Sequence, residues 1–262
     1  MYPEDDAKPP GTTDFNDGLY KVLWDALVEN AESMSKGKPY SYSRANFHQF
    51  GNLFYDFRKG PTEWAKDGTF AKTKKNIETY VDALNKRKPA VIVTLSEGGT
   101  FFHWFMRFIS EMGDAGKEWK SRYIAHWVSL SGTFGGTPEL LRAAIYPDSI
   151  DDYHMNQILP WITKTEFRDM SATLVATFTG MPNSYFKNED DEILVRSTSG
   201  NYSLSNLTLA FKDSGLIPQI SIFDQQKQHA FENQPSPGVP VSCFYGVNKD
   251  TLSTTDYMNG WN

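Results

Sequence analysis

The sequence is poor in the residues that build disulfides and metal sites. Cys243 is the only cysteine among 262 residues, which excludes an internal disulfide framework and any metal site built from several cysteines. The five histidines show neither H-x-x-x-H nor H-E-x-x-H spacing. We therefore expect no structural metal and no cofactor.

A basic tract is also missing, and the formal net charge is −6, so nucleic acid is not expected as a partner. No apolar run reaches the length of a membrane span. Residues 1–18 are polar and lack the apolar core of a signal peptide. Either the protein is cytosolic or this is not its natural beginning, and its compartment stays open.

Hydrophobic residues are abundant instead. They make up 39% of the chain, and aromatic residues alone make up 15%. This content is sufficient for a sizeable core. The aromatic surface suits a core, an apolar substrate cleft or a membrane-facing surface equally well.

The most informative segment is the apolar run 90–95, which ends abruptly at Ser96 and is followed by a helical apolar pattern over 101–112. A strand, a tight turn with a serine at its tip and a helix form the nucleophile elbow G-x-S-x-G, in which the serine projects above a sheet. Thr94 stands at the first glycine position, Gly98 at the second, and Gly99 follows. The pattern predicts acyl chemistry at Ser96.

An ordinary strand-to-helix turn explains the same letters. In that case Ser96 is the N-cap of the helix, and its side chain accepts a hydrogen bond from a backbone N–H of the first turn. The motif alone leaves the catalytic and the structural interpretation about evenly matched, because only its context distinguishes them.

Strand and helix patterns alternate along the chain, which is typical of a parallel sheet covered by helices. From residue 146 the periodicity weakens, as expected of a cap inserted over a sheet. Expected strands lie at 53–55, 90–95, 123–130 and 239–245, and expected helices at 19–33, 70–86, 101–112, 138–145 and 205–215.

Five short segments stand out along the chain. They are Y-D-F-R at 55–58, S-E-G-G at 96–99, W-K-S-R-Y-I at 119–124, V-S-L-S-G-T-F-G-G at 128–136 and C-F-Y-G at 243–246. In this order they resemble segments of the lecithin:cholesterol acyltransferase family, which includes phospholipid:diacylglycerol acyltransferases and a lysosomal phospholipase A2. Each short match is weak alone, and their order and spacing make the resemblance specific.

The resemblance implies an α/β-hydrolase-type fold with a mostly parallel, incomplete sheet and an inserted cap. We expect a disordered or extended N-terminus at 1–18, a first part of the core at 19–145, a cap-like insertion at 146–204 and a second part of the core at 205–262. Ser96 would be the nucleophile, and the backbone N–H of Glu97 would be an oxyanion donor. The implied partner is a phospholipid or another lipid ester, with peripheral membrane contact.

Two expected parts of such an enzyme are absent from the sequence. The family's G-D-G-T-V loop, which carries the aspartate, and the later histidine would follow the strand at 239–245. In the family a V-V-L-V-P-G strand supplies a second oxyanion donor. It would lie upstream of Asp14, where this sequence has no such segment. The resemblance therefore implies a chain shortened at both ends. In some members the cysteine that matches Cys243 pairs with a cysteine just before the aspartate loop. Cys243 is at least as well explained as a buried small hydrophobic residue.

The alternative is a catalytically inactive lipid-binding relative, or a gene fragment without the triad aspartate and histidine. Two departures from the elbow pattern favour it. Thr94 places a β-branched side chain where glycine relieves crowding, and the carboxylate of Glu97 would oppose a nearby oxyanion. Among the remaining residues, His229, Asp224 and Asp256 follow Ser96, but their polar surroundings give no basis for a local triad.

Overall fold

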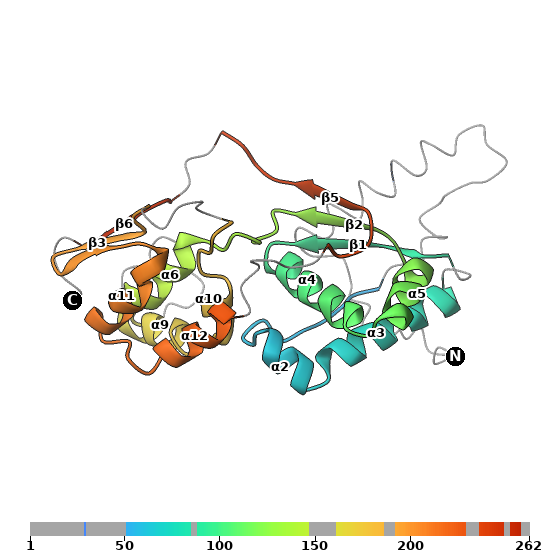
Figure 1. Ribbon diagram of the computed structural model, residues 1–262, viewed down its shortest axis with the longest axis horizontal. Helices are drawn as coiled ribbons and strands as arrows, with labels where there is room; N and C mark the ends of the chain where they lie inside the picture. Colours follow the sequence, from blue (N-terminus) through green and yellow to red (C-terminus); the bar gives the residue numbers. More distant parts are fainter. Residues whose placement is uncertain are drawn as a thin grey trace.

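The computed structural model describes residues 29, 51–84, 88–146, 161–185, 192–228, 236–248 and 252–257. Apart from residue 29, the helix expected at 19–33 lies outside these ranges. Within them the chain combines a parallel sheet with helices, which is compatible with the expected α/β class (Figure 1).

The central sheet contains β1 (Ala90–Leu95), β2 (Ile124–Leu130) and β5 (Val241–Phe244) in the order β1-β2-β5. Both pairings are parallel, with Leu95 opposite Leu130 and Leu130 opposite Phe244. Three of the predicted strands are thereby confirmed. Their carboxyl ends lie at one edge of the sheet, where α/β proteins place their sites.

Four helices lie on the same side of this sheet in Figure 1, namely α2 (Pro61–Lys66), α3 (Thr69–Thr79), α4 (Glu97–Ser110) and α5 (Asp114–Tyr123). Aromatic side chains fill the space beneath the sheet. Phe102 lies edge-on to Trp127 of β2 at 5.1 Å, and Trp64 is fully buried against Phe101. The helix expected at 70–86 begins as α3 and continues as a π-helical segment, η2 (Tyr80–Leu84).

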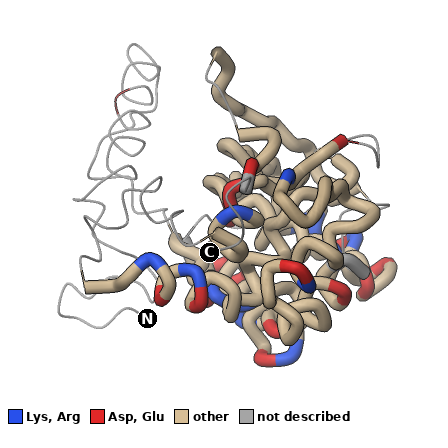
Figure 2. Tube along the Cα trace, turned by 90° about the vertical axis from the view of Figure 1, so that its left-hand side faces the viewer, with Lys and Arg blue, Asp and Glu red and all other residues tan. Residues whose placement is uncertain are grey.

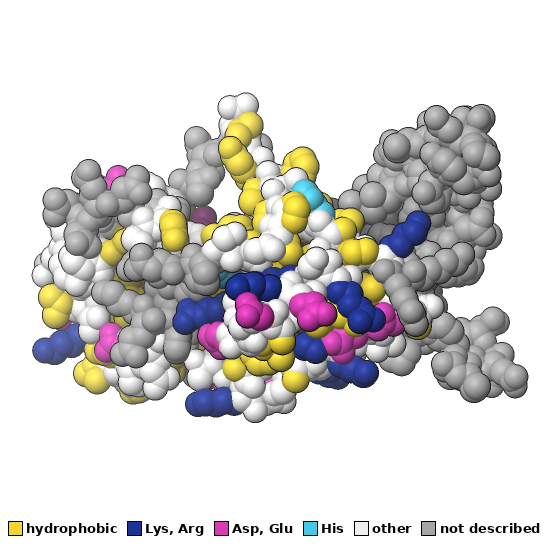
Figure 3. All heavy atoms as spheres, turned by 45° about the vertical axis from the view of Figure 1, so that its right-hand side comes forward, with side chains coloured by type: hydrophobic (Ala, Val, Ile, Leu, Met, Phe, Trp, Pro, Cys, Tyr) yellow, Lys and Arg dark blue, Asp and Glu magenta, His cyan; other side chains and the backbone are white. Residues whose placement is uncertain are grey.

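The opposite face of the sheet is open among the described residues. Val91 and Val93 of β1 and Phe244 of β5 are 58%, 40% and 59% exposed. Figure 3 shows hydrophobic side chains gathered at the top of this view, above a band of charged residues. Parallel sheets are ordinarily covered on both faces, so these side chains form an unusually exposed apolar surface on the described part of the sheet.

A second group of elements surrounds its own apolar cluster. It contains α6 (Pro138–Ile145), α9 (Lys164–Ser171), α10 (Val175–Thr179), η3 (Leu204–Asn206), α11 (Leu207–Asp213), α12 (Ile220–Gln228) and a sheet of β4 (Gly200–Tyr202), β3 (Val195–Ser197) and β6 (Thr255–Tyr257). Leu141, Leu194 and Phe211 belong to this one cluster. It joins residues from both sides of the expected boundaries at 145 and 204, and the division into core and cap stays a prediction.

Two expectations are wrong. Residues 53–55 form no strand, because no strand pairs with this segment within the described ranges. Tyr55 packs on a helix instead, with its ring stacked on Phe101 of α4 at 4.1 Å. Cys243 is exposed, so it is not a buried small hydrophobe.

Charge is distributed without a dominant sign. Figure 2 shows acidic and basic residues interspersed along the helices. Several form exposed pairs, such as Lys117 with Asp114 and Arg107 with Glu111, which contribute little to stability. Every helix in the described ranges is too short or too polar to span a membrane.

Candidate active site

Ser96 lies between the end of β1 and the start of α4, and its backbone adopts φ 52° and ψ −124°. This is a sparsely populated conformation for a residue with a side chain, and such strain occurs where the surrounding structure enforces it. The turn is fixed on both sides. Ser96 N–H donates to Leu130 O at 2.9 Å, and Gly99 N–H donates to Ser96 O at 2.9 Å.

The geometry argues against the N-cap interpretation. An N-cap serine has an extended backbone and a side chain that accepts a helix N–H, whereas Ser96 has a positive φ and makes no such hydrogen bond. Its side chain is exposed. A strained, exposed serine at the carboxyl edge of a parallel sheet matches the elbow geometry.

Glu97 is the first residue of α4, so its N–H belongs to the turn that lacks intrahelical acceptors. Nothing within the described ranges accepts a hydrogen bond from it. The side chain is half-buried, and desolvation raises the pKa of its carboxyl from 4.5 to about 7. Below neutral pH this carboxyl is therefore largely uncharged, and its expected opposition to an oxyanion is removed.

Thr94 does not crowd the turn. Its hydroxyl accepts a hydrogen bond from Trp127 Nε1 at 2.9 Å, which orients the threonine toward the helix-covered face. The close approach of backbones lies instead at Gly99, where an added Cβ would be 3.1 Å from Gly132 Cα. An added Cβ at Gly98 would meet nothing closer than Thr94 Cβ at 3.7 Å.

The two glycines of the elbow should therefore respond oppositely to alanine. Gly98→Ala should stabilise the fold by about 0.5–1 kcal/mol, because alanine is the better helix former and has room. Gly99→Ala should destabilise it by about 1–3 kcal/mol, because the neighbouring backbone must move. Urea unfolding of both variants measures the difference, and equal effects would contradict the described packing.

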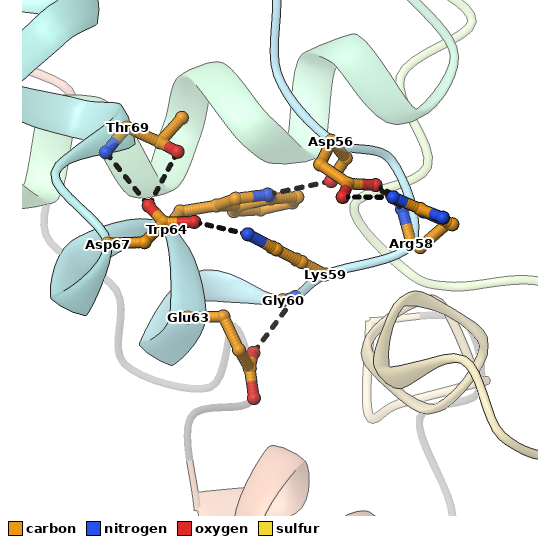
Figure 4. A network of polar contacts seen from close by, with 8 residues as sticks. All are labelled: Asp56, Arg58, Lys59, Gly60, Glu63, Trp64, Asp67 and Thr69. Atoms are coloured by element: carbon orange, nitrogen blue, oxygen red, sulfur yellow. Dashed lines mark hydrogen bonds and ion pairs between the residues drawn. The ribbon is translucent and has the colours of Figure 1, made fainter.

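The Y-D-F-R segment supports the elbow helix and does not supply a free carboxylate. Arg58 Nε and Nη2 donate to the two carboxylate oxygens of Asp56, both at 2.8 Å, and this pairing lowers the pKa of Asp56 (Figure 4). Trp64 Nε1 donates to Asp56 O at 3.0 Å. Tyr55, held by this loop, stacks on Phe101 one turn into α4.

The described histidines are not placed to serve Ser96. His103 is on α4 beside Trp127 and Phe134, and desolvation lowers its pKa to about 4. His126 lies opposite Val91, near the start of β1, and its Nε2 is 2.8 Å from Ser242 Oγ. His229 lies outside the described residues.

The aspartates considered from the sequence also lie apart from the elbow. Asp256 is on β6, where it is 3.9 Å from Arg196 of β3. Asp224 is exposed on α12. Throughout the described ranges, no group of three or more His, Cys, Asp or Glu side chains could hold a metal ion.

Sequence reasoning missed Ser131, which directly follows β2. Like Ser96 it has a positive φ, 48°, and an exposed side chain. Its N–H donates to Phe244 O at 2.7 Å. The signal was present in the sequence, because Leu130-Ser131-Gly132 repeats the pattern of an apolar strand that ends in serine and glycine.

Comparisons with known proteins agree with the resemblance. Residues 24–234 match the family described as lecithin:cholesterol acyltransferase. The chain is 28% identical over 203 residues to the "Lysosomal phospholipase A and acyltransferase" of Bos taurus, covering 78% of this chain and 45% of the relative. It is 24% identical over 212 residues to the "Lecithin-cholesterol acyltransferase-like 1" of Arabidopsis thaliana, covering 79% of this chain and 46% of that relative.

A third relative, the "Phosphatidylcholine-sterol acyltransferase" of Gallus gallus, is 25% identical over 203 residues, which are 78% of this chain and 45% of the relative. The chain thus spans about half the length of the curated relatives it matches. The family match extends over most of the sequence and includes the elbow. The chain belongs to the lecithin:cholesterol acyltransferase family.

Proposed function

We propose that this chain carries the nucleophile of an acyltransferase or phospholipase with an α/β-hydrolase-type fold, which takes an acyl group from a phospholipid or another lipid ester. The observation that supports the proposal most strongly is the conformation of Ser96, which is strained, exposed and unused as a helix cap. Membership of the family supports the substrate class.

In the proposed reaction Ser96 Oγ attacks the ester carbonyl carbon, and its proton passes to a base outside the described residues. The carbonyl oxygen becomes an oxyanion that accepts a hydrogen bond from Glu97 N–H, in the favourable field at the start of α4. The ester C–O bond then breaks, the base gives its proton to the departing oxygen, and a lipid alcohol leaves. Attack on the acyl-serine by an alcohol or water restores Ser96.

Contact with a lipid surface is part of the proposal. Phe54 and Phe57, on either side of Tyr55, are 58% and 60% exposed. Tyr55 Oη lies 3.9 Å from the Cβ position of Gly98, so the segment that carries both phenylalanines passes beside the elbow. Exposed aromatic side chains are suited to the boundary between water and lipid.

The second candidate is a lipid-binding relative without catalysis. It is favoured by the positions of the described histidines, neither of which reaches Ser96. In this case the elbow geometry is inherited and the chain binds lipid without reacting with it.

Acylation by 4-nitrophenyl octanoate distinguishes the two candidates. The nucleophile proposal predicts one octanoyl group on Ser96, detected by intact mass, and a matching release of 4-nitrophenol. Ser96→Ala should not be acylated, whereas Ser121→Ala, at an exposed position on α5, should behave as wild type. An unmodified wild-type chain would favour the binding protein.

A further inference from the structure

Ser131 lies beside Ser96 at the carboxyl edge of the central sheet. Ser96 N–H donates to Leu130 O at 2.9 Å, and this oxygen belongs to the same peptide unit as Ser131 N. The two backbone nitrogens are therefore at most about 5 Å apart. Both residues follow the last residue of adjacent parallel strands, so their exposed side chains share one edge of the sheet.

The loop that begins at Ser131 is held firmly. An added Cβ on Gly132 would lie 2.5 Å from Ser129 Oγ, and Thr133 Oγ1 is 3.1 Å from Thr100 Oγ1 of α4. From the other side Asn183 Nδ2 donates to Phe134 O at 2.9 Å. Ser131 is thus fixed between the elbow helix and the residues after α10, as a preorganised group must be.

The side chain of Ser131 has no structural use that explains its presence. No residue within the described ranges forms a hydrogen bond with its hydroxyl, and the side chain is exposed. A positive φ is costly for serine and easy for glycine. A residue kept in a strained conformation, with a free hydroxyl beside a proposed nucleophile, is a candidate for function.

We propose that the Ser131 hydroxyl is a second functional group of the Ser96 site, and that it forms a hydrogen bond with the alcohol oxygen of the reacting ester. This inference rests on the proposed function of Ser96. The tetrahedral intermediate has two oxygens besides Ser96 Oγ. The helix N–H at Glu97 serves the oxyanion, and Ser131, one strand away, is available to the other.

That other oxygen belongs to the alcohol that leaves during acylation and to the alcohol or water that attacks during deacylation. Negative charge develops on it as its bond to the acyl carbon breaks. A hydroxyl donor lowers the energy of this charge, and the effect is larger for an alkoxide than for a delocalised phenolate. Ser131 should therefore matter most for esters of aliphatic alcohols.

The test uses two octanoyl esters, ethyl octanoate and 4-nitrophenyl octanoate, with Ser131→Gly, Ser131→Ala and the control Ser121→Ala. Loss of one hydrogen bond should slow acylation of Ser96 by the ethyl ester about tenfold and by the 4-nitrophenyl ester less than about threefold. Thermal unfolding of Ser131→Gly should occur at the wild-type temperature or above it, because glycine accepts the positive φ without strain.

A merely structural role would slow both esters equally and lower the unfolding temperature, and that result would overturn the inference. So would wild-type rates with both esters in the two Ser131 variants. Labelling of wild type by a fluorophosphonate probe separates the outcomes. If Ser96 is labelled and the Ser131 variants show no leaving-group dependence, this inference alone fails. If Ser96 is not labelled, the proposed function fails and this inference with it.

Discussion

Gly136→Ala is expected to destabilise the fold by more than about 4 kcal/mol, a loss sufficient to unfold many small domains. A Cβ on Gly136 would lie 1.9 Å from Met181 O and 2.4 Å from Met181 C, and both atoms belong to the backbone. The neighbouring hydrogen bonds, Asn183 N–H to Gly135 O at 3.0 Å and Thr137 N–H to Gly180 O at 2.8 Å, hold the two segments together. The contact can be relieved only by separating them.

Gly68→Ala is the matched control for this variant. Gly68 has φ +82° and Gly136 has φ +74°, so alanine meets similar backbone strain at both positions, but an added Cβ on Gly68 has nothing within 4 Å. Gly68→Ala should cost about 1–2 kcal/mol. Urea unfolding of both variants isolates the contact with Met181, and similar losses would show that the loop does not pack against it as described.

Glu97→Gln is expected to raise stability at pH 8 by about 2 kcal/mol and to change it much less at pH 5. The folded-state pKa of about 7 lies above the ordinary value of 4.5. The folded state therefore holds the proton more tightly than the unfolded state. The stability of the wild-type protein falls as pH rises from about 4.5 through about 7. Above that range the whole free-energy cost of ionising the Glu97 carboxyl in the folded state is present. Glutamine removes this dependence because it does not ionise.

The same substitution should change the chemistry at Ser96. Ionised Glu97 opposes an oxyanion formed beside its own N–H, so the ratio of acylation rates, Glu97→Gln over wild type, should rise about tenfold between pH 6 and pH 8. The ratio cancels the titration of the base, which both proteins share. Glu111→Gln, at the exposed end of the same helix, is the control and should leave the ratio constant. If the ratio for Glu97→Gln stays constant between pH 6 and pH 8, the Glu97 carboxyl points into solvent and does not act on the oxyanion, which would contradict this prediction.

The strands and the helix of the elbow could be predicted from sequence because their signals are local. The apolar run 90–95 is six residues long and is followed by serine, glycine and a helical apolar pattern, so β1, Ser96 and α4 follow from neighbouring residues alone. The same holds for α6, which begins at Pro138 after the N-cap Thr137, whose side chain accepts from Glu139 N–H.

Features that depend on distant residues could not be predicted in this way. β6 is a polar segment of three residues that pairs with β3 about sixty positions earlier, and nothing in its own composition indicates a strand. The packing of Gly99 against Gly132 likewise joins residues far apart in sequence. The raised pKa of Glu97 comes from burial in the folded chain, which its own letter does not indicate. The strain at Ser131 becomes visible only in the backbone angles.

Fluorophosphonate labelling followed by peptide mapping tests the nucleophile most directly. The account predicts a single phosphonyl adduct on Ser96 of the folded chain, none on Ser96→Ala, and an undiminished adduct on Ser121→Ala. A folded wild-type chain that stays unlabelled, or an adduct on a different serine, would contradict it.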